Sequence, residues 1–120
     1  MKNNHFFNLI NPEKILLKKG NIYKFKLNQT FFKNGIRDFY FSDIKVNETK
    51  GWKLKKRCTV CIVVKGKIKF SFMDKKKIKN SKTLSEEQKK IIIIKKNIKF
   101  KFSNNDTITS SLISFLNEKF

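Results

Sequence analysis

Short runs of alternating hydrophobic and polar residues dominate the chain, and turn residues separate them. In segment 67–72, KIKFSF, the residues Ile68, Phe70 and Phe72 fall on one face, while two lysines and a serine fall on the other. This two-residue period predicts a β-strand with one buried face. Segment 98–102 repeats the pattern, and no internal repeat or long amphipathic helix interrupts it. Many short strands with regularly spaced turns predict an all-β sandwich or barrel.

The remaining hydrophobic runs predict the other strands and turns. Strands are expected at residues 21–27, 36–46, 52–64 and 91–94 and from residue 107 towards the C-terminus, and turns at Asn11-Pro12, Gly20, Asn34-Gly35, Lys65-Gly66 and Lys96-Asn97. The run Ile91–Ile94 is apolar on both faces, which indicates a central strand. Lys65-Gly66 is expected to form a tight hairpin. The polar stretch 75–90 leaves two alternatives, one helical turn with Ser85 as N-cap or a loop around a short strand.

The composition indicates one basic domain. With 120 residues the chain is long enough for one hydrophobic core, so we expect a single domain over residues 1–120. The formal charge of +20 favours anionic ligands. However, 27 of the 29 basic residues are lysines and alanine is absent, as in chains from AT-rich genomes, whereas nucleic-acid binders favour arginine. Because the lysines are spread along the sequence, a generally basic surface is favoured over a nucleic-acid groove.

Cys58 and Cys61 form a C-x-x-C motif inside the β-branched run CTVCIVV. A redox pair requires its first cysteine at a helix N-terminus, and residues three apart on a strand point to opposite faces. A zinc site requires two further ligands, and the chain has a single histidine, His5. We therefore interpret both cysteines as buried, reduced strand residues.

Neither a membrane span nor a signal peptide is predicted. No apolar run approaches the roughly 18 residues of a span. The apolar patch near the N-terminus is short and lacks a small-residue cleavage site. A cytoplasmic protein is therefore the expectation.

Lys53 and Lys55 are two residues apart, so on a strand their side chains point the same way. Together with Thr59 and Gly66 they match the spacing of the first cupin-barrel motif, in which two histidines share one metal. The second motif places Phe100 at its histidine position. Since a protonated lysine repels a cation and phenylalanine cannot ligate one, the sequence predicts no metal and no cofactor.

From about residue 20 to residue 115 the chain resembles the dTDP-4-dehydrorhamnose 3,5-epimerase family and the related dTDP-sugar ketoisomerases. The most specific piece is Lys50-Gly51-Trp52-Lys53 with the turn that follows at 64–70, and the second piece is 94–102, IKKNIKFKF. The resemblance implies a cupin jelly-roll barrel, usually a homodimer, with a nucleotide-sugar pocket inside the barrel and no metal. For an active member it implies a general base and a tyrosine acid.

The same resemblance places candidate site residues on this chain. The family's catalytic histidine falls on Lys55, which could act as a base only if burial or nearby cations lowered its pKa; otherwise it is a charged lysine at the barrel mouth. Asp38 and Tyr40 share a strand face and complete the catalytic candidates, unless they are an ion-pair partner and a core aromatic. The candidate substrate-binding residues are Trp52, Lys53, Arg57 and Phe100.

The leading hypothesis is a sugar-nucleotide cupin of surface polysaccharide (deoxysugar) biosynthesis. Lys53 and Lys55 would meet the diphosphate, and Phe100 would either stack on a ring or pack in the core. If catalysis is retained, the activity is a metal-independent epimerisation or isomerisation of a dTDP-4-keto sugar. One alternative is a basic β-barrel module that binds nucleic acid or anionic surfaces, since KFKF interleaves aromatics and lysines. Another is a structural cupin without a ligand.

Overall fold

Twelve β-strands and one 3-10 turn form the regular structure of residues 2–26, 36 and 38–116, which the computed structural model describes. The strands are β1 (Lys2–Asn3), β2 (Phe7–Ile10), β3 (Glu13–Ile15), β4 (Ile22–Lys24), β5 (Asp38–Ile44), β6 (Thr49–Leu54), β7 (Thr59–Lys65), β8 (Lys67–Met73), β9 (Lys79–Ser85), β10 (Ile91–Ile94), β11 (Lys99–Ser103) and β12 (Ser110–Leu116). The 3-10 turn η2 (Glu86–Gln88) follows β9.

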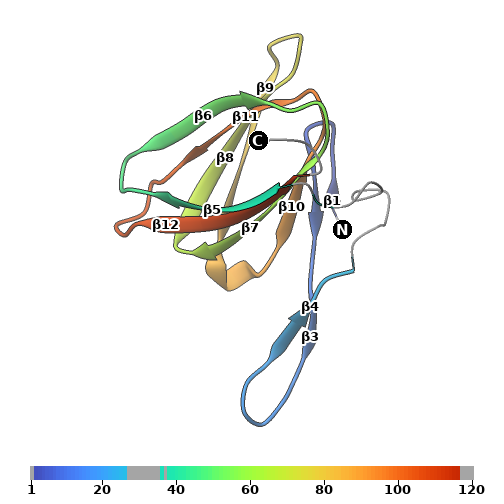
Figure 1. The fold of residues 1–120 in the computed structure, drawn as a ribbon, viewed down its shortest axis with the longest axis vertical. Helices are drawn as coiled ribbons and strands as arrows, with labels where there is room; N and C mark the ends of the chain where they lie inside the picture. The colour runs from blue at the N-terminus through green and yellow to red at the C-terminus, as the bar shows by residue number, and fades with distance from the viewer. Residues whose placement is uncertain (1, 27–35, 37, 117–120) are drawn as a thin grey trace.

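Two antiparallel sheets face each other, and a small hairpin extends away from them (Figure 1). The larger sheet has six strands in the order β1-β2-β10-β7-β12-β5, and the smaller has four in the order β6-β11-β8-β9. Strands β3 and β4 form the hairpin. This all-β jelly-roll architecture confirms the fold class predicted from the alternating pattern. Within the described residues, no helix is long and apolar enough to cross a bilayer.

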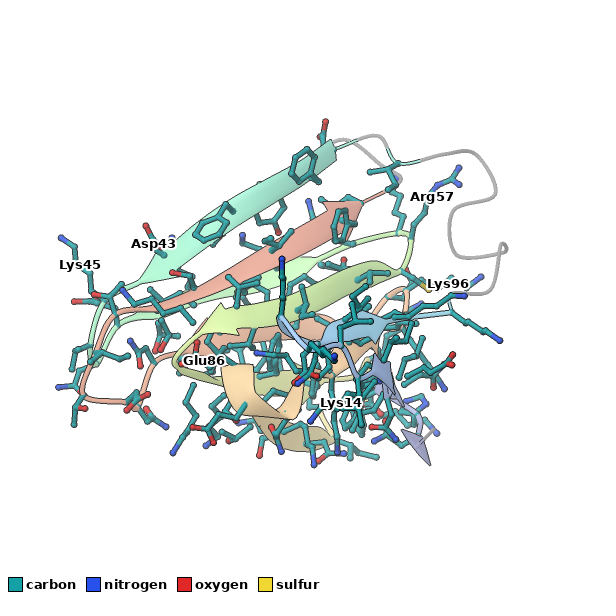
Figure 2. The ribbon with its side chains drawn as sticks, turned by 90° about the horizontal axis from the view of Figure 1, so that it is seen from below. Lys14, Asp43, Lys45, Arg57, Glu86 and Lys96 are labelled. Carbon is teal, nitrogen blue, oxygen red and sulfur yellow. The ribbon has the colours of Figure 1, made fainter. Side chains whose placement is uncertain are left out.

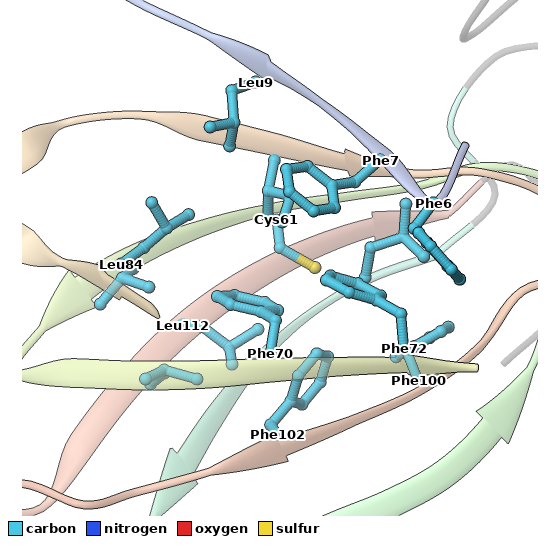
Figure 3. Packing of buried hydrophobic residues seen from close by; sticks show 14 of the residues in the cluster. Phe6, Phe7, Leu9, Cys61, Phe70, Phe72, Leu84, Phe100, Phe102 and Leu112 are labelled. Atoms are coloured by element: carbon cyan, nitrogen blue, oxygen red, sulfur yellow. The ribbon is translucent and has the colours of Figure 1, made fainter. Parts of the chain in front are cut away.

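One part of the interior, between β2 and β10 on one side and β8 and β9 on the other, is wholly apolar. We call it the apolar half, and it consists of Phe6, Phe7, Ile68, Phe70, Phe72 and Leu84, none more than 6% exposed. The ring centroids of Phe7 and Phe72 lie 5.0 Å apart, and Figure 3 shows how closely these rings pack. Burying each such side chain contributes about 1.5–3 kcal/mol, so this half holds the two sheets together.

Strand β10 lies between β2 and β7 in the six-stranded sheet, and all four of its isoleucines are buried. Ile92 and Ile94 belong to the interior cluster, whereas Ile91 and Ile93 belong to a second cluster on the outer face of the sheet. Because both faces are covered, no position of the strand needs to be polar. The prediction of a central strand is confirmed.

Two predictions about the stretch from 52 to 70 are wrong. The expected strand 52–64 is two strands, β6 and β7, which belong to different sheets. The charged residues 55–57 between them bend at the rim, because they cannot be buried in the middle of a sandwich. Lys65-Gly66 is not a hairpin, since β7 pairs with β10 and β12 while β8 pairs with β9 and β11. Gly66 carries the chain between sheets at φ +74°, where a Cβ would lie 2.2 Å from Ser110 Oγ.

Two regions form strands that the sequence analysis had left undecided or had not predicted. The stretch 75–90 contains both expected alternatives, because β9 is followed by a helical turn in which the Ser85 amide donates to Gln88 Oε1 at 2.9 Å. The N-terminal β2 was not predicted, yet it pairs with β10 and contributes Phe7 to the core. The packed structure therefore begins well before residue 20. The expected turn at Asn34-Gly35 and the end of the expected strand 21–27 lie outside the described residues.

Cys58 and Cys61 are both free thiols. Cys61 lies within β7, and its sulfur points into the interior beside Phe70 and Phe72 (Figure 3). Cys58 precedes β7, is half-buried, and packs against the outer cluster. The two side chains point to opposite faces as predicted, but only Cys61 is a buried strand residue.

Asn104, which is completely buried, holds the turn after β11. Its Nδ2 donates to the carbonyls of Ile44 at 2.7 Å and Ile108 at 2.8 Å. Its Oδ1 accepts from the Asp106 amide at 2.9 Å and from the Ser110 hydroxyl at 3.2 Å. This single side chain therefore closes the turn and ties it to the end of β5.

Candidate functional site

Lys53 lies in the interior between two aromatic rings. Its Nζ is 5.5 Å from the ring centroid of Tyr40 and 6.0 Å from that of Phe102. Tyr40 belongs to the six-stranded sheet, whereas Lys53 and Phe102 belong to the four-stranded sheet, so the three side chains join the sheets. Attraction between the ammonium and the rings offsets part of the cost of its partial burial.

A β-bulge in β6 lies directly before Lys53, which faces the interior, and contains Trp52, which faces outward. Lys53 is paired with Phe100 on β11, whereas the next pair joins Gly51 to Lys101, so Trp52 is the extra residue. A Cβ on Gly51 would lie 2.6 Å from the Lys101 Cβ, and Gly51 has φ +129°. Glycine is therefore required for this close approach. The Trp52 ring lies 4.7 Å from Lys101 Nζ, on the outer face of the sheet.

Cys61 and Ser114 lie close to the same lysine. Together with Lys53 and Tyr40 they form what we call the polar half of the interior. The Cys61 Sγ and the Ser114 Oγ are 3.2 Å apart, and both residues are completely buried. Burial raises the pKa of Cys61 to about 12, although the hydrogen bond with Ser114 and the charge of Lys53 act in the opposite direction. The thiol therefore stays protonated and unreactive at neutral pH.

The environment shifts the pKa values of Lys53 and Tyr40 in opposite directions. Burial lowers the pKa of Lys53, and the positive charges of Lys55 and Lys50 lower it further, against a smaller effect of Cys61. Burial raises the pKa of Tyr40, and the neighbouring Ser114 side chain opposes this shift. An ammonium group attracts an anion, and a phenol donates a proton. The polar half can thus bind an anion through Lys53 or transfer protons.

The other predicted site residues lie around this group. Asp38 begins β5 on the same inner face as Tyr40, and it is half-buried. Lys55 follows β6 and is half-buried, whereas Arg57 is exposed at the bend, at one end of the molecule (Figure 2). Phe100 is 1% exposed and lies in the core opposite Lys53. The structure thus brings Lys53, Tyr40 and Phe100 together, with Asp38 and Lys55 at the edge and Trp52 on the outside.

Thr59 adds a buried hydroxyl at the same end of the interior as Asp38. It is paired with Leu116 and Ile94, and Leu116 is also paired with Asp38. Its Oγ1 is buried and has no hydrogen-bond partner among the described residues. An unsatisfied buried hydroxyl is costly, so Thr59 adds a polar position to this end of the interior. No three His, Cys, Asp or Glu side chains gather as metal ligands in the part of the chain that the structure describes.

Sequence reasoning did not identify Ser114 or Cys61 as part of this group. The signal for Ser114 is its polar character at an inward position of β12, directly across from Tyr40. The β-bulge at Trp52 was not predicted either, and the only feature of the sequence that could have indicated it is Gly51.

Several solved structures have the same fold at low sequence identity. A mutant of the 3,4-ketoisomerase QdtA from Thermoanaerobacterium thermosaccharolyticum, in complex with TDP-4-keto-6-deoxyglucose, has a TM-score of 0.77 and 16% identity over 98% of this chain and 84% of that chain. The dTDP-4-dehydrorhamnose 3,5-epimerase from Elizabethkingia anophelis has a TM-score of 0.81 and 14% identity, over 99% of this chain and 74% of that chain. ChmJ, a 3'-monoepimerase from Streptomyces bikiniensis in complex with dTDP-quinovose, has a TM-score of 0.83 and 9% identity, over 100% of this chain and 69% of that chain.

The chain shares the fold of these proteins. The resemblance predicted from the spacing of the motifs around Lys53 and Phe100 is therefore confirmed for the fold, a cupin jelly roll. Comparisons with protein-family models and with curated proteins found no match.

Proposed function

We propose that the polar half of the interior binds a nucleotide sugar. The observation that carries the proposal is Lys53, a cation held between the Tyr40 and Phe102 rings inside a fold whose solved examples include complexes with TDP-4-keto-6-deoxyglucose and dTDP-quinovose. An ammonium group suits a diphosphate. The half-buried Tyr40 ring offers a face to a sugar or base, and the Thr59 hydroxyl offers a hydrogen bond.

The same groups support a metal-independent epimerisation or isomerisation of a dTDP-4-keto sugar. Removal of a proton next to a keto group requires a base, and return of a proton requires an acid. Lys53 stays with the diphosphate as a cation, while Tyr40 suits the acid and Asp38, on the same inner face of β5, suits the base. The sequence pointed to Lys55 as the base. We now propose that the charge of Lys55 lowers the pKa of Lys53. Asp38 lies on the same strand face as Tyr40. We place this activity in cytoplasmic deoxysugar synthesis for surface polysaccharides.

Calorimetric titration with TDP and dTDP-glucose tests binding. In Lys53→Gln the affinity should fall on the order of tenfold or more, because a charge-assisted contact to phosphate is lost. Lys45→Gln is the matched control, since it removes the same charge from an exposed turn at the opposite end of the molecule (Figure 2). Failure of the unmodified protein to bind either ligand at millimolar concentration would contradict the proposal.

Proton exchange tests the activity separately from binding. In D₂O, an active protein should incorporate deuterium at C3 or C5 of dTDP-4-keto-6-deoxyglucose, and Lys53→Gln and Tyr40→Phe should each slow this exchange. Tight binding without exchange in the unmodified protein would identify a binding protein that has this fold but lacks the reaction.

We also propose a homodimer, formed through the outer face of β5 and β12. In the described chain β5 is an edge strand of the six-stranded sheet. Phe39 and Phe41 on its outer face are 67% and 60% exposed, and the Phe39 ring stacks on Phe115 at 5.8 Å. Two such rings on an open edge suit a second copy of the chain. Light scattering should give the mass of a dimer, and Phe39→Ser/Phe41→Ser should give a monomer.

The outer face of the four-stranded sheet favours a second function, the binding of single-stranded nucleic acid. The registers of the described strands bring together on this face Lys67, Lys69, Lys79, Lys99 and Lys101, and Glu87 lies at its border beside Lys67. Trp52 is 41% exposed and lines a recess with Lys69 and Lys79. Lysines beside an exposed aromatic ring suit a phosphate backbone and a stacked base.

Titration with an oligothymidylate at increasing salt tests this second function. A steep loss of affinity with salt is expected, together with a further loss of about 1–3 kcal/mol in Trp52→Ala. If Trp52→Ala binds as tightly as the unmodified protein, the interaction reflects net charge alone.

A further inference from the structure

Cationic turns gather at one end of the sandwich. Turns 55–57, 74–77 and 95–96 hold eight Lys and Arg residues and one carboxylate. The Asn97 amide donates to the Lys55 carbonyl at 2.9 Å, Lys75 and Lys76 line one cavity with Lys96, and Figure 2 shows Arg57 and Lys96 at this end. Turns 45–48, 86–90 and 104–109 at the other end hold three lysines and four carboxylates. Lysines that are evenly spread in the sequence are thus concentrated in space.

A cavity of about 450 Å³ opens at this cationic end. It lies where turn 74–78 and turn 95–98 meet residues 4–6, and its lining includes His5, Asp74, Lys75, Lys76 and Lys96. Most of the exposed wall is apolar, and Ile78 and Ile98 contribute to it. This volume lies in the range of small-molecule sites. The cavity shares no lining residue with the polar half of the interior.

Asp74, the carboxylate of this lining, is fully engaged by donors. Its Oδ1 accepts from the amides of Lys76 and Ile78, each at 2.9 Å, and its Oδ2 lies 3.2 Å from His5 Nε2. Desolvation, the largest single effect, would raise the pKa of Asp74, but the hydrogen bonds from Ile78, Lys76 and His5 together outweigh it and lower the pKa. The carboxylate therefore fixes the turn and the His5 ring, which joins residues 69 positions apart in the sequence.

We propose that this cavity is a second ligand site, which binds a small phosphate monoester with an apolar body. Lys75, Lys76 and Lys96 supply three ammonium groups for the phosphate. Ile78, which is 56% exposed, and the nearly buried Ile98 contact the apolar body. The concentration of cations at this end attracts the anion to the cavity.

The test uses phenyl phosphate as the probe and the His5 ring as the reporter. The chain has a single histidine, so its ring signals in a proton–carbon NMR spectrum need no assignment. Phenyl phosphate should shift these signals saturably, whereas phenol at the same concentration should not. Lys75→Gln/Lys76→Gln should weaken the binding on the order of tenfold. Lys45→Gln/Lys65→Gln is the matched control, because both lysines are exposed and at the opposite end.

Three results would overturn the proposal. These are the absence of a saturable shift, an equal loss of affinity in the control pair, and a response to phenol that equals the response to phenyl phosphate. Vesicles of phosphatidic acid in place of the soluble ester show whether a lipid headgroup is accepted as a source of the monoester.

A further arm separates this site from the nucleotide-sugar site. The phenyl phosphate response should persist unchanged in Lys53→Gln, in which the nucleotide-sugar site is disabled. Loss of the His5 response in Lys53→Gln would mean that the cavity is an extension of the interior site, and would contradict a second site. Failure of TDP binding in the unmodified protein, by contrast, leaves this test unaffected.

Discussion

The apolar and polar halves of the interior lie between the same two sheets but consist of different residues. The apolar half is closed by aromatic rings such as Phe70 and Phe72, which are completely buried. The polar half keeps an amine, a phenol, a thiol and a hydroxyl inside, at a cost in desolvation. The comparison indicates a division of labour, in which the apolar half supplies stability and the polar half, which loses stability, keeps groups that contact a ligand.

The largest expected effect is in the apolar half. Phe72→Ala should lower the free energy of unfolding by about 3–5 kcal/mol, because it opens a cavity next to the ring of Phe7. Urea unfolding measures the change. Leu16→Ala is the control, since Leu16 is 74% exposed and should cost far less. Equal losses in the two variants would break the distinction between core and surface.

The second effect tests the bulge that orients the polar half. Gly51→Ala should cost roughly 1–3 kcal/mol, because φ is +129° and the new Cβ would lie 2.6 Å from the Lys101 Cβ. It should also weaken TDP binding, since Lys53 moves. Gly20→Ala is the control: Gly20 has φ +138° but nothing within 4 Å of the new Cβ. If Gly20→Ala costs as much as Gly51→Ala, the close approach to β11 contributes nothing.

The third effect is the pH dependence caused by Cys61. Its pKa is about 12 in the folded chain against an ordinary 9.0, so above about pH 9 the unfolded chain releases a proton that the folded chain retains. Stability should therefore fall as the pH rises from about 9 to 12, by at most about 1.4 kcal/mol per pH unit. Cys61→Val should flatten this slope in urea unfolding, and Cys58→Val should preserve it. An identical slope in all three proteins would contradict the assignment to Cys61.

The smallest effect on stability is expected from Lys53. Lys53→Met keeps the length of the side chain but removes a half-buried charge, so stability should stay equal or rise by up to about 1 kcal/mol. Binding of TDP should be lost in the same variant. Thermal unfolding and calorimetry on one preparation measure both quantities. A clear loss of stability would show that Lys53 supports the fold. The polar half would then contribute to stability as the apolar half does.

Much of the fold could be predicted from the alternating pattern, because burial of one face is a local property of the sequence. The central strand at Ile91–Ile94 and the inward Phe70 and Phe72 follow from it. The pattern could not show that β6 and β7 belong to different sheets, since the two-residue period continues regardless of which sheet a strand joins.

The candidate site was predictable only in part. The spacing around Lys53 identified the strand and the basic residues, but Trp52, a candidate for the pocket, is the extra residue of a bulge and lies on the outer face beside Lys101. The contact of Lys53 with Tyr40 depends on the meeting of two sheets, and the contact of His5 with Asp74 joins distant turns. Neither contact produces a repeating pattern in the sequence, so both could be identified only from the structure.

Asn104 shows how unequal the freedom to vary is along this chain. Its amide serves four partners at once, two through its nitrogen and two through its oxygen. Aspartate has the same shape but offers no donor for the carbonyls of Ile44 and Ile108, and glutamine places the same groups one methylene further out. The exposed lysines of the surface can therefore be replaced by other residues as the composition changes, whereas at residue 104 only asparagine meets all four hydrogen bonds.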